Sequence, residues 1–381
     1  MTSRAVKNFR YVFLTVFVFV FIISISKFDQ ISDVVSQTSL VVGKFASVSN
    51  ITGIGGGLTS QQPERMNATF VTLCRNEDLY HLLPTIQGVE DRFNLNYHYS
   101  WVFLNDKEFS EEFKSATSAL VSGEVYYGSI PTEQWSYPEW IDQEKAARGR
   151  EELQAKKVIY GGSESYRHMC RYESGFFWRH PLLDQFKYYW RVEPDTKLHC
   201  DIQYDLFKFM EDNNKTYGFT ISMYEFAETI PTLWKTTVDF LNENPQYRNS
   251  NPLLDFISGD GGQTYNNCHF WSNFEIANLD FWRSDAYRAY FDYLDHSGGF
   301  FYERWGDAPV HSLAASLFLD QSEIHHFEDV GYFHNPNNNC PTNEETRRKL
   351  KCTCNPRENF SWKWYSCTNT FYKARNLTRP W

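Results

Sequence analysis

The sequence predicts an α/β protein whose central sheet has parallel neighbouring strands. Residues 68–73 form an apolar run of strand length, residues 79–93 follow with helical spacing, and residues 99–104 form a second apolar run. This strand, helix, strand order is typical of parallel sheets with helical crossovers. The chain of 381 residues is 42% hydrophobic and 22% charged, which provides enough apolar material for a core and excludes wholesale disorder.

The amino-terminal residues predict a membrane anchor. Residues 11–26 carry no charge and are dominated by Phe, Val and Ile, and a helix of that length spans roughly 24 Å, close to the thickness of early secretory membranes. Basic side chains in residues 1–10 favour a cytoplasmic tail. A cleaved signal peptide is the alternative, because its apolar region has a similar length, but no A-x-A-like cleavage site follows Ser26.

The remaining residues divide into a stem and one large domain. Residues 27–65 are rich in Ser, Thr, Gln and Gly and show no lasting periodicity, which is typical of a flexible luminal stem. The character changes near Met66, so we expect a single catalytic domain over residues 66–381. The net charge of −10 argues against nucleic acid as a partner, because phosphate contacts require basic patches. Nothing in the sequence indicates an oligomeric state.

Two features of the domain indicate the secretory pathway. All eight cysteines follow the anchor, and an even count suits disulfides, although the sequence leaves their pairing open. Cys352 and Cys354 form no Cys-x-x-Cys motif, so a zinc site is not expected. Acceptor triplets for N-glycosylation occur at Asn50, Asn67, Asn214, Asn359 and Asn376.

Acidic residues follow a strand further along the chain. Residues 164–187 have the pattern of a helix broken at His180-Pro181, and the apolar run 188–192 that follows ends at Glu193-Pro194-Asp195. Ligand sites of open α/β sheets gather at the carboxyl ends of strands. In an extended triplet Glu193 and Asp195 point the same way, and a Mg²⁺ or Mn²⁺ ion between them would offset their repulsion. The alternative is a turn with two solvated acids.

Later segments add further acids and imidazoles. Residues 217–221 predict another strand, and Glu225 follows it. Glu275 is a lone acid in an apolar stretch, where it is either a satisfied core residue or a catalytic carboxylate with a shifted pKa. His334 closes a histidine-rich run and fits a single imidazole ligand of Mn²⁺. The sequence lacks the phosphate loop of NTPases, the nucleophile elbow of serine hydrolases and the glycine motif of dinucleotide-binding proteins.

Six motifs then make the chain recognisable. They are WVFLND at 101–106, SYRHMCR at 165–171, YWRVEPD at 189–195, SNFEI at 272–276, RWGDAPVHS at 304–312 and the run 326–334. With them the chain resembles the fungal α-1,2-mannosyltransferases of glycosyltransferase family 15, from about Asn67 to the carboxyl terminus. The resemblance implies a GT-A-like nucleotide-sugar-binding domain, with a central mixed sheet flanked by helices, after a single transmembrane helix and a stem.

The resemblance also implies a metal and donor site. Glu225 and His334 match direct ligands of Mn²⁺, and Glu193, in the Glu-Pro-Asp motif that replaces the usual Asp-x-Asp, is a third expected ligand. The region expected to contact the donor diphosphate comprises Glu193, Asp195, Arg167 and Arg171. Mn²⁺ would act as a Lewis acid on the GDP leaving group.

Catalytic roles are implied for three further residues. Glu275 matches the acid proposed as the nucleophile, Tyr166 matches a tyrosine near the donor phosphates, and Asp307 matches an acid of the active site. The family retains the anomeric configuration. Retention would follow either from double displacement, with Glu275 as the covalent nucleophile, or from transfer on one face, with Glu275 stabilising an oxocarbenium ion. The sequence leaves both routes open.

The resulting expectation is a type II membrane enzyme of the Golgi. It would transfer mannose from GDP-mannose to the 2-hydroxyl of a mannose on O- or N-linked glycans of a glycoprotein acceptor. The alternatives are transfer of mannosylphosphate to the same glycans and, from another class, a mannan-binding protein without catalysis. Five intact residues argue against the last alternative: Glu193, Asp195, Glu225, Glu275 and His334.

Overall fold

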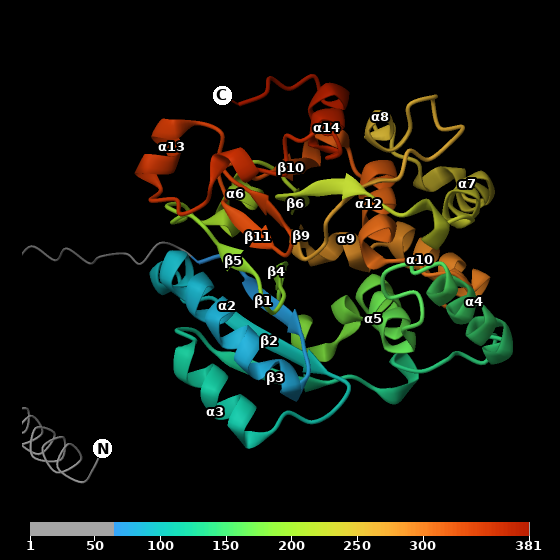
Figure 1. Ribbon diagram of the computed structural model, residues 1–381, viewed down its shortest axis with the longest axis horizontal. Coiled ribbons are helices and arrows are strands. Elements are labelled where there is room, and N and C mark those ends of the chain that lie inside the picture. The colour runs from blue at the N-terminus through green and yellow to red at the C-terminus, as the bar shows by residue number, and fades with distance from the viewer. Residues whose placement is uncertain (1–64, 381) are drawn as a thin grey trace, which may run out of the picture. The chain divides into compact units, whose positions relative to one another are not determined.

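Seven strands form the central sheet of the computed structural model, which describes residues 65–380 (Figure 1). Their order across the sheet is β10-β6-β9-β4-β1-β2-β3. The strands are β1 (Ala68–Leu73), β2 (Ser100–Asn105), β3 (Val125–Ser129), β4 (Tyr188–Val192), β6 (Tyr217–Phe219), β9 (Phe274–Asn278) and β10 (Ile324–His326). This is the central sheet of the predicted α/β class, and each strand named in the prediction is present.

Parallel and antiparallel pairs both occur in this sheet. β1 pairs in parallel with β2 and β4, and β2 pairs in parallel with β3. β9 runs antiparallel between β4 and β6, and β10 is parallel to β6. The helix α2 (Leu79–Arg92) connects β1 to β2, which confirms the predicted strand, helix, strand order. The sheet is therefore mixed, and β9 is the reversed strand among the seven.

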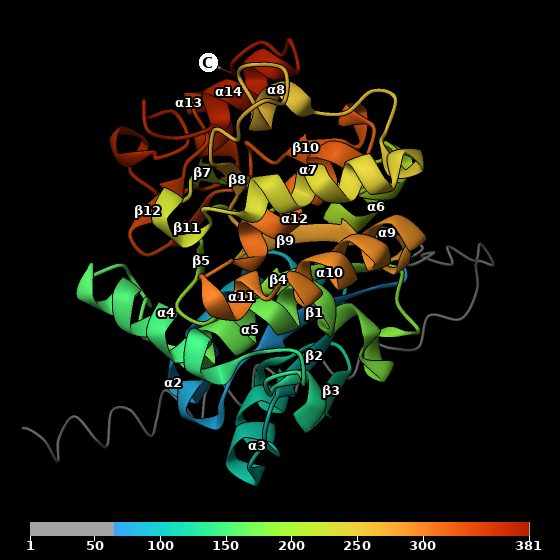
Figure 2. The same ribbon diagram turned by 90° about the vertical axis from the view of Figure 1, so that its right-hand side faces the viewer.

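Helices cover both faces of the sheet (Figures 1 and 2). Besides α2, the helices of these two layers are α3 (Glu111–Leu120), α5 (Glu164–Gly175), α6 (Leu206–Asp212), α7 (Leu233–Glu243), α10 (Asp285–Ser297) and α12 (Asp307–Phe318). Successive strand side chains point to opposite faces, so the sheet has two cores. Phe70 and Trp190 belong to the core with α2, α3 and α6, whereas Val71 and Tyr189 belong to the core with α5, α7, α10 and α12.

Shorter elements complete the structure. The other helices are α4 (Gln143–Ala155), α8 (Leu254–Ile257), α9 (Leu279–Arg283), α11 (Gly299–Tyr302), α13 (Glu344–Lys349) and α14 (Thr368–Ala374). Two small antiparallel sheets flank the main one: β11 (Tyr332–His334) lies between β5 (Lys197–Leu198) and β12 (Asn337–Asn339), and β7 (Ser222–Tyr224) pairs with β8 (Cys268–Phe270).

The helix predicted over residues 164–187 is shorter than expected. α5 ends at Gly175, and two 3₁₀ turns follow at Phe177–Arg179 and Pro181–Leu183. A Cβ atom at Gly175 would lie 1.9 Å from the ring of Phe291, so the glycine permits close packing of α5 against α10. The chain leaves the helix at that contact, five residues before the expected break at His180.

Three disulfides join distant parts of the chain. They connect Cys200 with Cys352, Cys268 with Cys367, and Cys340 with Cys354. Cys74 and Cys170 are buried thiols without a disulfide partner. The expectation of disulfides is therefore confirmed for six of the eight cysteines, and a pairing that the sequence left open is now assigned.

Several expectations fall outside the described residues. The predicted tail (1–10), the membrane anchor (11–26), the glycosylation triplet at Asn50 and nearly all of the stem lie before residue 65. Among residues 65–380, no helix has both the length and the apolar character needed to cross a membrane.

Candidate active site

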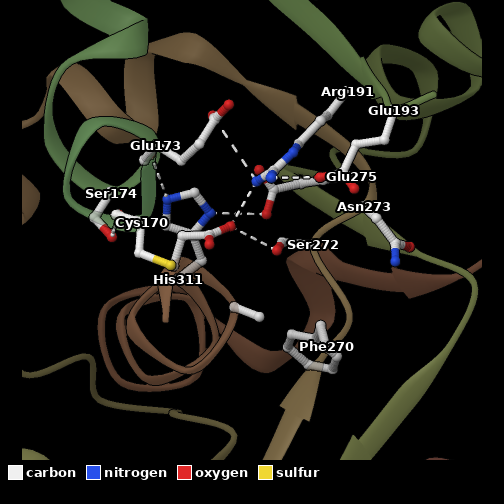
Figure 3. A network of polar contacts seen from close by, with 12 residues as sticks. Cys170, Glu173, Ser174, Arg191, Glu193, Phe270, Ser272, Asn273, Glu275 and His311 are labelled. Carbon is white, nitrogen blue, oxygen red and sulfur yellow. Dashed lines mark hydrogen bonds and ion pairs between the residues drawn. The ribbon is translucent and has the colours of Figure 1, made fainter. Parts of the chain in front are cut away.

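Glu275 lies at the centre of a buried hydrogen-bond network. It projects from β9, and its side chain has no exposed surface. The Tyr189 hydroxyl on β4 donates to Oε1, and the Tyr217 hydroxyl on β6 donates to Oε2 over 2.7 Å. Nδ1 of His311, on α12, lies 2.9 Å from Oε2. Both carboxylate oxygens are therefore bound by protein groups from three different elements. Figure 3 shows His311 and Glu275 of this network.

Arg191 joins several acids beside this network. Its Nη1 lies 2.5 Å from Oδ2 of Asp307, and its Nη2 lies 2.5 Å from Oε1 of Glu193. Oε2 of Glu173, on α5, is 3.8 Å from Nη1. Ser272 donates a further hydrogen bond of 2.7 Å to Asp307. One buried guanidinium thus holds together carboxylates from the residue after β4, from α5 and from the first turn of α12, as Figure 3 shows for Glu173 and Glu193.

The pKa shifts follow from burial and from this charge balance. Burial raises the pKa of Glu173 to about 7, although Arg191 opposes the shift. Burial acts in the same direction on Asp307, but Arg191 and His311 outweigh it and lower the pKa of Asp307 overall. Burial would lower the pKa of His311, but the neighbouring Glu275 carboxylate raises it overall. Asp307 is therefore ionised at neutral pH, whereas Glu173 exchanges its proton near neutrality.

The expected metal ligands are only partly assembled. Nε2 of His334 lies 3.7 Å from Oε2 of Glu193, and both side chains are about a quarter exposed. Glu225 lies apart from this contact in an ion pair with Arg304, whose Nη2 is 3.2 Å from Oε1. Within residues 65–380 no three His, Cys, Asp or Glu side chains gather as a metal-binding group. The structure therefore brings together two of the three expected ligands, Glu193 and His334.

The Glu193-Pro194-Asp195 segment differs from the extended form expected for it. Pro194 and Asp195 form a turn, and Asp195 has a left-handed backbone with φ of 61°. Its Oδ1 lies 3.0 Å from Nδ1 of His81, and both of these side chains are about two-thirds exposed. The two acids therefore bind different partners, because the turn redirects the Asp195 side chain. Asp195 matches the alternative of a solvated turn acid, whereas Glu193 does not.

Tyr166 lies near two of the expected site acids. Its ring stacks on Tyr160 with 4.5 Å between centroids, and the Arg304 guanidinium lies 5.2 Å from its centroid. Burial raises the pKa of Tyr166, and the charges of Asp307 and Glu225 add to the shift. The structure thus brings Tyr166, Glu225 and Asp307 into one neighbourhood around Arg304.

Arg167 and Arg171 differ from their expected role at the donor diphosphate. Arg167 is fully buried and donates to the backbone carbonyls of Ser163 and Glu303. Arg171 is also buried and forms two hydrogen bonds, of 2.7 and 2.8 Å, with the carboxylate of Asp295. Helical periodicity places both side chains on the inner face of α5, where they bind protein groups in this structure. Their contact with the donor diphosphate stays a prediction.

The four described glycosylation triplets fall into two groups. Asn67, Asn214 and Asn376 are exposed, although Nδ2 of Asn67 donates to the carbonyl of Gln185 over 2.5 Å. Asn359 is buried, and its Nδ2, the atom that would carry the glycan, donates to the carbonyl of Cys340 over 2.5 Å. In this structure Asn359 does not present its side-chain amide to solvent, and its glycosylation stays a prediction.

A pocket of about 180 Å³ opens at the carboxyl ends of β1 and β2. Its lining comprises Leu73, Cys74, Arg75, Asp78, Asn105, Asp106, Trp135 and Met169. α5 contributes Met169 to this pocket and Glu173, one turn further on, to the acid cluster around Arg191. The pocket therefore occupies the strand ends at which ligands of α/β sheets bind.

Sequence reasoning missed the partners that organise the acids. Arg191, Tyr189, Tyr217, Glu173 and His311 were not expected as site residues. One available signal was strand alternation, because Tyr189 and Arg191 share a face of β4, and Glu193, the residue after the strand, continues the same alternation. Tyr217 of β6, Glu173 of α5 and His311 of α12 had no local signal in the sequence. Their place in the site depends on how these elements pack around β9.

Known relatives extend over most of the chain. A family model described as glycolipid 2-α-mannosyltransferase matches residues 36–376. Glycolipid 2-α-mannosyltransferase 1 of Candida albicans is 62% identical over 316 residues, which cover 83% of this chain and 73% of the relative. The α-1,2 mannosyltransferase KTR1 of Saccharomyces cerevisiae is also 62% identical over 316 residues, which cover 83% of this chain and 80% of the relative.

A solved structure agrees with these sequence matches. Core-mannan synthase A of Aspergillus fumigatus, crystallised in its Mn/GDP form, superposes with a TM-score of 0.77 at 40% sequence identity. The superposition covers 86% of this chain and 93% of the synthase. The α/β glycosyltransferase fold with a central mixed sheet flanked by helices is thereby confirmed. The chain belongs to the glycolipid 2-α-mannosyltransferase family, as the resemblance to glycosyltransferase family 15 predicts.

Proposed function

We propose that this chain is an α-1,2-mannosyltransferase that moves mannose from GDP-mannose to the 2-hydroxyl of a mannose on O- or N-linked glycans. The names of its relatives support the reaction, and the Mn/GDP form of core-mannan synthase A supports the metal and the nucleotide. The observation that carries the proposal is the acid cluster on Arg191, in which Glu193 and Asp307 meet at the carboxyl end of β4.

The nucleotide end of the donor fits the pocket at the ends of β1 and β2. Arg75, Asp78, Asn105 and Asp106 line it with hydrogen-bonding groups, and Trp135 adds an aromatic wall. α5 runs from this pocket to the acid cluster, with Met169 at one end of the path and Glu173 at the other. A donor bound in the pocket would therefore direct its diphosphate and sugar along α5 toward Glu193 and Asp307.

The residues present fit a manganese ion that is completed by the donor. Glu193 and His334 offer one carboxylate and one imidazole, and both are partly exposed. Mn²⁺ accepts such ligands, and hard cations at phosphate sites often take one or two protein ligands plus phosphate oxygens. Glu225 is a third ligand in the proposal, and it must leave Arg304 to reach the ion. A bound Mn²⁺ would stabilise the negative charge on the departing GDP.

The side chains of the site hold their positions before a substrate arrives. Arg191 forms ion pairs with Glu193 and Asp307 and fixes the spacing between them. Tyr166 lies beside Arg304, with the guanidinium 5.2 Å from the centroid of its ring. Such preorganised charges need no rearrangement when charge develops in the transition state. Retention of configuration in the product is part of the proposal.

The location of the enzyme is also proposed. Residues 11–26 would form the signal anchor of a type II membrane protein, residues 1–10 its cytoplasmic tail and residues 27–65 its stem, with the catalytic domain in the Golgi lumen. Three disulfides within the described residues support an oxidising compartment. The exposed triplets at Asn67, Asn214 and Asn376 support the same compartment.

A product assay tests the reaction. The full chain, in detergent or in membranes, is incubated with GDP-mannose, Mn²⁺ and a methyl mannoside or a mannosylated peptide. We expect a disaccharide linkage that an α-1,2-specific mannosidase cleaves. A phosphodiester product would replace this proposal with mannosylphosphate transfer. Mannoside binding without any product would favour a mannan-binding protein.

A further inference from the structure

The environment of Glu275 is closed to a sugar in this structure. The side chain has no exposed surface, and its three partners, Tyr189, Tyr217 and His311, are also buried, at 1% exposure or less. Each partner already contacts a carboxylate oxygen. A group that attacks an anomeric carbon has to reach within about 3–3.5 Å of it. Glu275 has no such access while these contacts persist.

The hydrogen bonds also fix where the protons lie. Nε2 of His311 is 3.2 Å from the backbone carbonyl of Glu173, and a carbonyl only accepts hydrogen bonds, so Nε2 carries a proton. The two tyrosine hydroxyls donate to Glu275. A single further proton is then shared between Nδ1 of His311 and Oε2 of Glu275. The negative charge of Glu275 is therefore compensated inside the protein by His311 (Figure 3).

α12 connects this pair to the exposed part of the site. His311 and Asp307 are four residues apart on α12, so their side chains lie on the same face of the helix. Asp307, the first residue of the helix, contacts Arg191, which in turn contacts Glu193. The Glu275–His311 contact therefore fixes the rotation of α12, and with it the position of Asp307.

We propose that Glu275 and His311 form a buried positioning pair that orients Asp307 through α12, and that Glu275 does not bond to the sugar. This inference rests on the proposed function, because it assigns roles within that reaction. It selects between the two routes that the sequence left open: transfer on one face needs no covalent bond to Glu275, whereas double displacement requires one. The role of Glu275 is then to hold Tyr189, Tyr217 and His311 in one arrangement.

The first test is Glu275→Gln in the full chain. The amide keeps the shape of the side chain: its oxygen accepts from Tyr189, and its nitrogen donates to Nδ1 of a neutral His311 and to the Tyr217 oxygen. We expect kcat within about tenfold of wild type and an unchanged KM for GDP-mannose. A loss of about 10³-fold or more in a stably folded Glu275→Gln would overturn the inference, because that is the effect of removing a nucleophile.

Glu90→Gln provides a matched control. Glu90 is also buried, at 3% exposure, and it accepts hydrogen bonds from Trp101 and Asn94 on the other side of the sheet. Its replacement should alter stability and leave kcat unchanged. This variant measures what the loss of one buried carboxylate costs in a place without a role in the reaction.

A second test compares Glu275→Leu, His311→Leu and the double variant. A positioning pair predicts similar losses of kcat in the two single variants and no greater loss in the double variant. Added azide should not restore turnover; a mannosyl azide product from Glu275→Leu would overturn the inference. The same cycle measured as unfolding free energy tests the pairing even if the wild type transfers no mannose. Additive stability losses would refute the pair, whereas an inactive wild type would refute only the proposed function.

Discussion

Replacing Arg191 with methionine should destabilise the fold more than any nearby surface change. Arg191 is 7% exposed, and its two terminal nitrogens lie 2.5 Å from Asp307 and 2.5 Å from Glu193. Methionine keeps much of the side-chain volume but leaves these acids, and Glu173, without their cation. Removing one partner of a buried ion pair costs about 3–5 kcal/mol, so we expect the unfolding free energy at neutral pH to fall by that amount.

The loss should depend on pH in a defined direction. Burial raises the pKa of Asp307, but Arg191 and its neighbours lower it overall. A carboxyl with a lowered pKa stabilises the fold above its unfolded pKa, and this contribution disappears as the pH falls through the folded pKa. Without Arg191, burial dominates, and Asp307 takes up a proton at higher pH. The deficit of Arg191→Met should therefore be largest near pH 7 and smaller near pH 4.

Chemical denaturation followed by tryptophan fluorescence at both pH values measures this deficit. Arg179→Met is a suitable control, because Arg179 forms a partly exposed ion pair with Asp292 at 3.3 Å, and such pairs contribute about 1 kcal/mol or less. If Arg191→Met loses less than about 1 kcal/mol at neutral pH, or loses the same amount at pH 4, the charge balance assigned to Arg191 is wrong.

Three further predictions concern the metal, the buried arginines and the acid on α5. Chelation should abolish transfer, and Mn²⁺ should restore it. His334→Ala should raise the Mn²⁺ requirement by more than the roughly 10–100-fold that loss of an outer-shell partner costs. Full activity in chelator would contradict the assignment of His334 and Glu193 as ligands. Arg171→Met should lower the melting temperature and leave the KM for GDP-mannose unchanged, because Arg171 binds Asp295. A raised KM at unchanged stability would instead indicate that Arg171 contacts the donor. Glu173 has its pKa raised to about 7, so its ionisation costs stability as the pH rises from about 4.5 to 7. Glu173→Gln should therefore gain stability relative to wild type over that range in denaturation curves, and a constant difference between the two would contradict the shift.

Local patterns predicted those parts of the fold that depend on neighbouring residues. The apolar runs 68–73, 99–104 and 188–192 lie within one residue of β1, β2 and β4, because a strand buried on both faces is a nearly continuous apolar stretch. The position of Glu193 was also predictable, since a residue just after a buried strand lies at the sheet edge. The same reasoning failed for Asp195, two residues later. Pro194 favours an extended backbone only for the residue before it, whereas Asp195 adopts a left-handed conformation in a turn.

Partner identity was beyond local patterns because it depends on distant segments. The bond between Tyr217 and Glu275 joins residues 58 apart, and the one between Arg191 and Asp307 joins residues 116 apart. Similarly, the disulfide of Cys200 closes a separation of 152 residues. A sequence alone shows that a buried acid needs a partner, but it does not show which side chain the fold will bring to it.

The reversed strand β9 explains why the acids of this site have such different exposure. Because β9 runs antiparallel between β4 and β6, Glu275 pairs in register with Arg191 and Phe219 at the middle of the sheet, where helices cover both faces. Glu193 lies just beyond the end of β4, where a ligand can approach. A carboxylate in the sheet interior, such as that of Glu275, needs fixed protein partners, whereas one at the strand end, such as that of Glu193, can bind a metal ion. The topology therefore assigns Glu275 to the support of the site and Glu193 to its surface, although the two glutamates belong to adjoining networks.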